Sequence, residues 1–417
     1  MSELKYIDLF AGAGGLSEGF IRAGFKPVAH VEIDNAACYT LRTRAVYHYL
    51  KSINKYDLYI AYLKGDISRK ELYSSVPSEV LDTIINLPIG AEHYSEINKI
   101  IEEQLRVRKV DLIIGGPPCQ AYSLVGRARS KTSMSDDPRN YLYIPYAEFL
   151  GKYEPKMFVF ENVVGLKSAG NGIYLEDMRK LFLTKGYFLK LFIVEANNFG
   201  VLQNRKRIII IGWRKELSLD IPDLESIKIN TDYKVRHLFE DLPGIQAGEG
   251  KDKFLTYKSD TNSYLEQSLI RNGIDVLTQH VARPHTDQDK EIYRIALKKW
   301  NKKRERLNYN DLPDRLKTHK NRDSFYDRFK VVAPDEPYSQ TVVAHIAKDG
   351  HYYIHPDISQ NRSITVREAA RLQSFPDDYY FEGIREGINR TPGFRQIGNA
   401  VPPLMAFEIA KKLRSLL

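Results

Sequence analysis

The sequence predicts an α/β fold in which a mostly parallel sheet is covered by helices on both faces. Three features of the first 215 residues support this prediction. Short, mostly apolar runs alternate with helical stretches, their apolar residues do not alternate regularly with polar ones, and Gly, Pro or Asn bound the runs. Strands without polar alternation are typical of parallel sheets, because helices cover both of their faces.

Six apolar runs are predicted as strands, and the segments between them supply four helices. The strands are Tyr6–Phe10, Pro27–Glu32, Val110–Gly115, Met157–Glu161, Phe188–Glu195 and Ile208–Trp213. The helices are Ser17–Ala23, Ala36–Tyr49, Tyr141–Lys152 and Gly172–Lys185, and a last helix is predicted at Leu404–Leu417. In such sheets ligands bind beyond the carboxyl ends of the strands, and the candidate site residues fall there.

Two segments depart from this alternation. Residues 69–109 are mostly helical and are predicted to be an insertion. After residue 215 the alternation fades into sequence rich in Pro, Asp, Lys and Tyr, which predicts a second, smaller and irregular α+β domain over residues 216–394.

The charge balance favours a polyanionic partner, nucleic acid first. The chain has 62 Lys and Arg against 53 Asp and Glu, a net charge of +9. Residues 280–330 hold 15 of these cations and 8 of the acids, which indicates either a phosphate-facing surface or a solvated helical face. The chain has no apolar run long enough for a membrane span and no signal-peptide pattern, so an intracellular location is expected. Two cysteines exclude a disulfide scaffold and a zinc site built on several thiolates.

A glycine-rich turn follows the first strand. After Phe10 come Gly12, Gly14 and Gly15, and a helix begins shortly afterwards. Such a turn lets a ligand approach the backbone, and the helix N-terminus offers free N–H donors. The second strand ends in Glu32, where an acid can bind ribose hydroxyls. Together these features predict a site for a nucleoside cofactor.

Three further strand ends carry reactive side chains. Gly-Gly-Pro-Pro stops a buried strand and presents Cys119 at a rigid turn, where a thiolate could attack an electrophilic carbon. Cys38 lies inside a predicted helix and is expected to be inert. Glu161 ends an apolar strand and could act as an acid with a raised pKa. Arg205 and Arg207 begin the last strand, and their spacing predicts that both lie on one face of it.

In this order, these blocks resemble the motif series of the cytosine-5 DNA methyltransferases. The matching blocks are DLFAGAGG, VEID, GDI (Gly65–Ile67), GGPPCQAYS, ENV, QNRKR, REAARLQSFPDDY and QIGNAVPP. They cover roughly the first 215 and the last 55 residues. The resemblance implies the class I fold of S-adenosylmethionine-dependent methyltransferases, in which residues 395–417 return to complete the catalytic domain of residues 1–215.

The resemblance also implies a mechanism. Cys119 would add to carbon 6 of cytosine and make carbon 5 able to take the methyl group. Glu161 would bind ring nitrogen 3 and the exocyclic amine, and Arg205 and Arg207 would hold the carbonyl oxygen. The base must be flipped out of the duplex, because carbon 6 is shielded there. No metal ion is expected.

The implied cofactor is S-adenosylmethionine, with S-adenosylhomocysteine as the product. Phe10 would stack on the adenine, Glu32 would bind the ribose, and Asp66 would read the adenine amino group. Ile33 and Ile67 would pack around the ring. The other residues expected in this pocket are Ala11, Gly12, Gly14, Gly15, Leu16, Pro117, Leu142, Asn399 and Val401.

Duplex DNA is the implied partner, and residues 216–394 would be the target-recognition domain. The residues expected to contact DNA are Gln120, Ser123, Gly126, Arg127, Arg129 and Thr341. The family places the protein in the bacterial cytoplasm as a monomer acting on chromosomal DNA in a restriction–modification system, with a cognate endonuclease that shares the site without binding the protein. A tRNA methyltransferase is the alternative, since a tRNA-modifying branch shares these motifs. The long region before REAARLQ favours DNA, because reading a duplex groove requires a dedicated surface.

Overall fold

The computed structural model describes residues 3–105, 109–118, 137–217, 222–323 and 325–417. A seven-stranded sheet, with the strand order β3-β2-β1-β4-β5-β7-β6, organises the first half of the chain. The neighbouring strands among β1 to β5 run parallel, and β7 runs antiparallel to β5 and β6. The predicted mostly parallel sheet is therefore confirmed. The strands are β1 (Lys5–Leu9), β2 (Lys26–Val31), β3 (Ile84–Ile85), β4 (Leu112–Gly115), β5 (Met157–Asn162), β6 (Tyr187–Glu195) and β7 (Lys206–Arg214).

The central strands are buried on both faces. In β7, Ile208 and Ile210 belong to one hydrophobic core, and Ile209 and Ile211 belong to a second core. Successive side chains of a strand point to opposite faces, so the two cores lie on opposite sides of the sheet. This explains why the central strands are mostly apolar.

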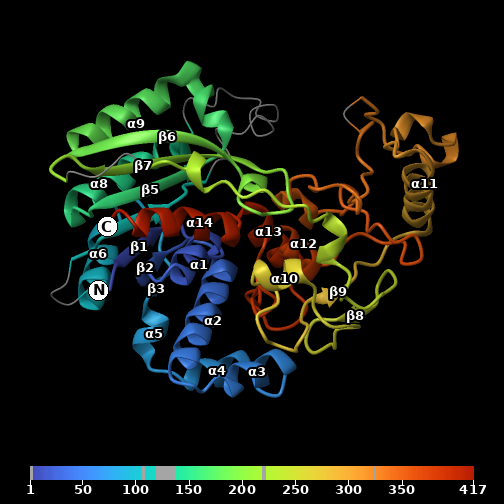
Figure 1. Ribbon diagram of the computed structural model, residues 1–417, viewed down its shortest axis with the longest axis horizontal. Coiled ribbons are helices and arrows are strands. Elements are labelled where there is room, and N and C mark those ends of the chain that lie inside the picture. The colour runs from blue at the N-terminus through green and yellow to red at the C-terminus, as the bar shows by residue number, and fades with distance from the viewer. Residues whose placement is uncertain (1–2, 106–108, 119–136, 218–221, 324) are drawn as a thin grey trace.

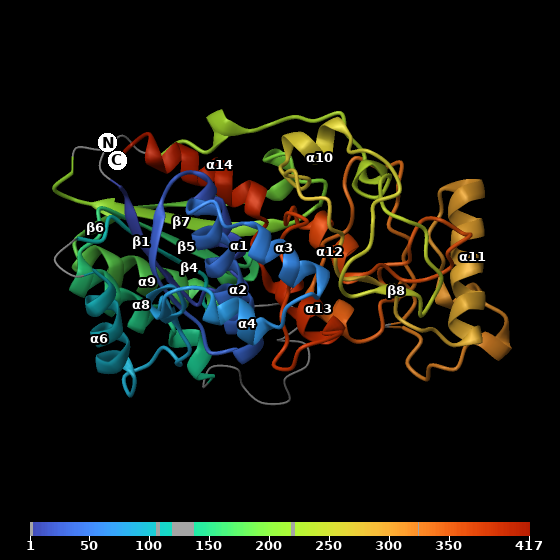
Figure 2. The same cartoon turned by 90° about the horizontal axis from the view of Figure 1, so that it is seen from below.

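Helices cover both faces of the sheet (Figure 1). Helices α6, α8 and α9 contribute to the first core, and α1 and α14 contribute to the second. Figure 2 shows α8 and α9 on one side of the strands and α14 on the other. The helices of this part are α1 (Gly15–Arg22), α2 (Asn35–Ser52), α3 (Asp57–Lys64), α4 (Arg69–Ser74), α5 (Ser78–Asp82), α6 (Tyr94–Leu105), α8 (Tyr143–Tyr153), α9 (Ile173–Thr184) and α14 (Pro403–Arg414).

The segment of residues 69–109 is more than a helical insertion. It contains α4, α5 and α6, as the sequence predicts, and it also supplies β3. Strand β3 pairs in parallel with β2, with Val31 opposite Ile85, and forms one edge of the sheet. Helix α3 was not predicted.

Residues 216–394 contain little regular structure. Their elements include β8 (Gly250–Lys251), β9 (His280–Val281), α10 (Ser263–Gln267), α11 (Asp287–Lys303) and α12 (Val366–Leu372), followed by α13 (Arg390–Asn399). Figures 1 and 2 show this part beside the sheet, with α11 at its far end. Among the described residues, no helix combines the length and the apolar character that crossing a membrane requires.

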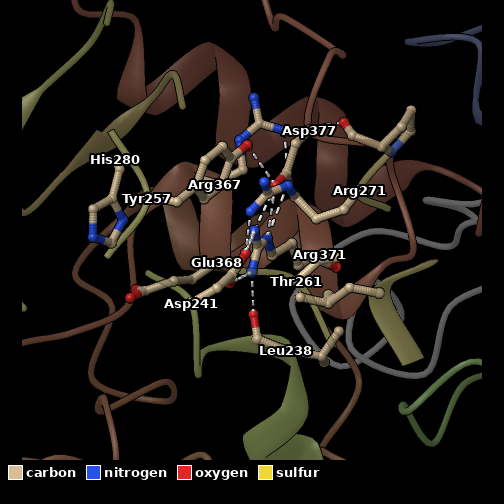
Figure 3. Close-up of polar contacts among 12 residues, drawn as sticks. Leu238, Asp241, Tyr257, Thr261, Arg271, His280, Arg367, Glu368, Arg371 and Asp377 are labelled. Carbon is tan, nitrogen blue, oxygen red and sulfur yellow. Dashed lines mark hydrogen bonds and ion pairs between the residues drawn. The ribbon is translucent and has the colours of Figure 1, made fainter. Parts of the chain in front are cut away.

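A buried ionic network fixes α12 in this part of the molecule (Figure 3). Arg371 donates to Asp241 and to Asp377, each at 2.5 Å, and to the carbonyl oxygen of Leu238 at 2.7 Å. Arg271 donates to the second oxygen of Asp241 at 2.6 Å. Buried charges require such pairing, because an unpaired one would be strongly destabilising. The network holds in place the turn that follows α12.

Candidate active site

Most of the candidate residues that the structure describes lie at one edge of the sheet. Parallel strands β1, β2, β4 and β5 end there, and antiparallel β7 begins there. The edge carries two groups of residues, one around Glu32 and one around Glu161.

Glu32 ties the end of β2 to the glycine-rich turn. One carboxylate oxygen accepts the N–H of Gly12 at 2.7 Å, and the other accepts those of Ile33 and Asp34 at 2.9 and 2.8 Å. Burial raises the pKa of Glu32, although these three hydrogen bonds oppose the shift. Phe10 is half-buried beside this group, and the Ile33 side chain is 64% exposed.

The glycine-rich turn is closed by the far end of the chain. Gly12 and Gly14 have φ values of 55° and 77°, which favour glycine. A Cβ on Gly15 would lie 2.3 Å from the carbonyl oxygen of Val401, so only glycine fits there. Ala11 and Leu16 are buried, and Asn399 is exposed at the end of α13. The sequence-predicted residues from both ends of the chain are thus brought together.

Asp66 lies elsewhere. It is exposed after Gly65, the C-cap of α3, and Ile67 packs against a tyrosine-rich cluster of α2 and α3. The residue that follows the strand beside Glu32 is Asn86, at the end of β3. Its side-chain amide donates to the carbonyl oxygens of Glu32 and Ile33, each at 3.1 Å.

Leu87 follows Asn86 and packs against the same core as Phe10. Asn86 and Leu87 therefore lie beside Glu32 and the core against which Phe10 packs, and Asp66 and Ile67 lie at the end of α3. The sequence signal for this strand end was the short apolar run Ile84–Ile85 followed by Asn86. It was missed because residues 69–109 were predicted to be a helical insertion.

Glu161 is the centre of the second group. Its Oε1 atom lies 2.8 Å from Nε of Arg207. A Cβ on Gly116 would lie 2.6 Å from Oε2 of Glu161, so the carboxylate packs directly against the backbone after β4. Burial raises the pKa of Glu161, and the charges of Arg207 and Arg205 oppose the shift.

The turn after β4 is supported by Asn162, whose side-chain amide donates to the carbonyl oxygen of Pro117 at 3.3 Å. The quoted ENV block contains Asn162, but the sequence alone did not indicate this role. Pro117 is buried and Leu142 is half-buried at the start of α8. Cys119, which follows Pro118, lies outside the described residues, as do Gln120, Ser123, Gly126, Arg127 and Arg129.

Arg205 and Arg207, the two arginines of the QNRKR block, bind different partners. Strand β7 begins at Lys206, so Arg205 lies just before it. Arg205 is fully buried and donates to the carbonyl oxygens of Val342, Gly398 and Ala400 at 2.7, 3.1 and 2.8 Å. Arg207 instead pairs with Glu161. The expectation that both act on one face of a strand does not describe this geometry.

Thr341 lies beside the same strand start. Its hydroxyl donates to the carbonyl oxygen of Asn204, and the backbone N–H of Asn204 donates to the carbonyl oxygen of Ser339 at 2.9 Å. A segment of residues 216–394 is thereby joined to the Arg207 end of the site.

The basic segment of residues 280–330 forms α11 and the loops after it. Lys302 and Lys303 are exposed at the end of α11, and Arg304 forms an ion pair with Asp335 at 2.6 Å. A phosphate-binding role for this segment stays a prediction. In the described part of the chain, no group of three or more His, Cys, Asp or Glu side chains could hold a metal ion.

Comparison with known proteins identifies the family of the chain. The family model for the C-5 cytosine-specific DNA methylases matches residues 4–68 and 79–415. The type II methyltransferase M.Bpa9945I of Bacillus paralicheniformis is 41% identical, over 99% of this chain and 98% of the relative. The type II methyltransferase M1.HphI of Haemophilus parahaemolyticus is 32% identical, over 98% of this chain and 86% of the relative.

Among solved structures, a protein described as a DNA modification methyltransferase encoded within an E. coli prophage is 25% identical. It has a TM-score of 0.64, and the match covers 99% of both chains. The S. pombe Dnmt2 methyltransferase, at 14% identity and a TM-score of 0.54, shares the fold. The chain therefore belongs to the C-5 cytosine-specific DNA methylase family and is a DNA (cytosine-5) methyltransferase.

Proposed function

We propose that the Glu161 group and Cys119 carry the methyl transfer to a flipped-out cytosine. The Cys119 thiolate forms a bond to carbon 6, which makes carbon 5 nucleophilic. After carbon 5 takes the methyl group, loss of its proton and of the thiolate restores the ring. Glu161 binds ring nitrogen 3 and the exocyclic amine, because its raised pKa allows it to share a proton with the base.

The observation that carries this proposal is the Glu161–Arg207 pair, in which Oε1 of Glu161 lies 2.8 Å from Nε of Arg207. The Glu161 carboxylate packs against Gly116, which is three residues before Cys119 in the sequence. Charge builds on the cytosine ring as the thiolate adds. A carboxyl and a guanidinium already held in place stabilise that charge without reorganisation. Arg207 holds the carbonyl oxygen of the base, and Arg205 contributes by fixing the backbone of residues 342 and 398–400.

The Glu32 group fits S-adenosylmethionine, which the family implies. A Cβ on Gly12 would meet nothing within 4 Å, so the turn is open to a ligand at that residue. Glu32 is held at the strand tip by three backbone donors. When bound, the cofactor supplies an electrophilic methyl group. We assign the ribose to Glu32 and the adenine to Phe10, Asn86 and Leu87. Asn399 and Val401 complete the pocket at the far end of the chain.

Residues 216–394 act as the target-recognition domain for duplex DNA, with residues 1–215 and 395–417 as the catalytic domain. The parallel bridge between Gln203 and Ser339 supports a close connection of the two at the catalytic edge. Thr341 contacts DNA beside the flipped nucleotide. We propose a monomer in the bacterial cytoplasm, protecting DNA from an endonuclease that recognises the same site independently.

Trapping with 5-fluorocytosine tests the mechanism. Duplex DNA with this base at the target should form a covalent complex in the presence of S-adenosylmethionine, because fluorine blocks the final elimination. Peptide mapping should place the adduct on Cys119, and Cys119→Ser should form none. An adduct on Cys38, which is buried, would overturn the assignment.

A second assay separates DNA from tRNA as the substrate. Duplex DNA should accept a tritiated methyl group and tRNA should not. Bisulfite sequencing of DNA from a host that expresses the protein then identifies the modified site.

A further inference from the structure

The glycine-rich turn is braced from outside the sheet by Tyr379. The Tyr379 hydroxyl donates to the carbonyl oxygen of Ala13. A Cβ on Gly14 would lie 2.9 Å from the same hydroxyl, and one on Gly15 would lie 3.1 Å from the ring of Phe375. The turn after α12 therefore forms the outer wall of the turn that follows β1.

Arg44 in α2 holds Tyr379 in place. Its guanidinium lies 4.8 Å from the centre of the Tyr379 ring and 3.8 Å from that of Tyr47. It donates to Glu18 at 2.7 and 2.9 Å and to Asp378 at 2.9 Å. One buried side chain thus joins α1, α2 and the residue next to Tyr379.

These charges are buried together. Burial alone would raise the pKa of Glu18, but Arg44 holds that pKa well below its usual range. Removing one member of such a group leaves the others uncompensated, so the arrangement is held as a unit.

The brace continues into residues 216–377. The second carboxylate oxygen of Asp378 accepts the side-chain amide of Asn272 at 2.5 Å. Asp377 is bound by Arg371 in the network of Figure 3, and its backbone N–H donates to the carbonyl oxygen of Ile270. Contacts of Asp377 and Asp378 with Ile270, Asn272 and Arg371 therefore fix the position of Tyr379 within the proposed target-recognition domain.

We propose that Tyr379, oriented by Arg44, is a positioning residue of the cofactor site. It holds the glycine-rich turn in the conformation that binds S-adenosylmethionine and connects that turn to residues 216–377. This rests on the proposed assignment of the cofactor to the turn. Because the connection is mechanical, cofactor binding and the placement of the target-recognition domain are coupled, and the coupling acts equally in both directions.

Tyr379→Phe tests the proposal, because it removes one hydroxyl and keeps the ring. The Ala13 carbonyl is left without this donor, so the Kd of S-adenosylhomocysteine, measured by titration calorimetry, should rise roughly 5- to 50-fold. In turnover, the KM for S-adenosylmethionine should rise while kcat at saturating cofactor stays near that of the wild type. S-Adenosylhomocysteine should also strengthen DNA binding less than it does in the wild type.

Tyr380→Phe is the matched control. Tyr380 is also buried, and its hydroxyl donates to the Asp252 carboxylate, away from the turn. It should lose comparable thermal stability and leave the Kd unchanged. A Tyr379→Phe protein with the wild-type Kd, or equal weakening in both variants, would overturn the inference. If the wild type fails to bind S-adenosylhomocysteine, the proposed cofactor site is itself wrong.

Discussion

Gly116→Ala tests whether methyl transfer requires the Glu161 carboxylate in its present position. The substitution displaces that carboxylate without removing any reacting group. The new Cβ would lie 2.6 Å from Oε2 of Glu161, and ordinary contact begins at 3.4 Å, so the carboxylate has to move by about 0.8 Å (3.4 − 2.6). Its other oxygen is bound to Arg207 at 2.8 Å, so the movement strains or breaks that pair.

The expected effect falls on the chemical step. A misplacement of about 1 Å at a reacting centre costs up to roughly 10²-fold in rate, so kcat should fall about 10- to 100-fold. S-Adenosylhomocysteine affinity should stay the same, because Glu32 holds a different part of the edge. Single-turnover transfer of a tritiated methyl group to duplex DNA measures the step directly.

Gly90→Ala is the control for adding a methyl group near the sheet. A Cβ there would meet nothing within 4 Å, so its rate should equal that of the wild type. A Gly116→Ala rate above half of the wild-type rate would refute the argument, since it would show that a displaced Glu161 carboxylate still supports the chemical step.

Three further predictions follow from the site and its surroundings. Asn86→Ala should raise the KM for S-adenosylmethionine several-fold and Asp66→Ala should not; the reverse result would restore Asp66 to the pocket. Arg205→Met should lower the free energy of unfolding in urea by at least about 2 kcal/mol, because three buried carbonyl groups lose their donor, whereas Arg207→Met should reduce kcat because the base loses its guanidinium. Burial, and then the charge of Glu32, raises the pKa of Asp8 well above its usual range. The stability that depends on this protonated carboxyl is fully present below its unfolded pKa and is lost as pH rises through the folded value. Asp8→Asn should therefore flatten the decline of unfolding free energy toward alkaline pH, and an unchanged pH profile would contradict the assignment.

The sheet was predictable from the sequence because both of its faces are buried. Runs such as the one in β7 have no polar alternation, and only a strand between two helical layers is apolar throughout. Strand β3 escaped prediction because two paired residues are too short to establish a period, and the helical segments around it dominated the pattern.

The candidate site was predictable in part for a related reason. Glu32 and Glu161 end long apolar strands, so their place at the sheet edge follows from the sequence. Arg205 and Arg207 are two residues apart, yet one lies before the strand and is bound by carbonyl groups from residues 342–400. Such roles depend on partners from distant segments of the chain, and the spacing of neighbouring residues does not reveal those partners.

The closure of the glycine-rich turn by residues 400–407 has a consequence for how the molecule assembles. Gly15 contacts Val401 and Gly19 contacts Phe407, so a binding turn made by the first strand is finished by the last helix. During synthesis β1 and α1 leave the ribosome long before α14, so this face of the sheet stays uncovered until residues 403–414 have been made. Contacts of such long sequence separation form late and slowly, and the uncovered face is prone to aggregation meanwhile. The ability to bind a nucleoside would then appear only after α14 has packed against α1.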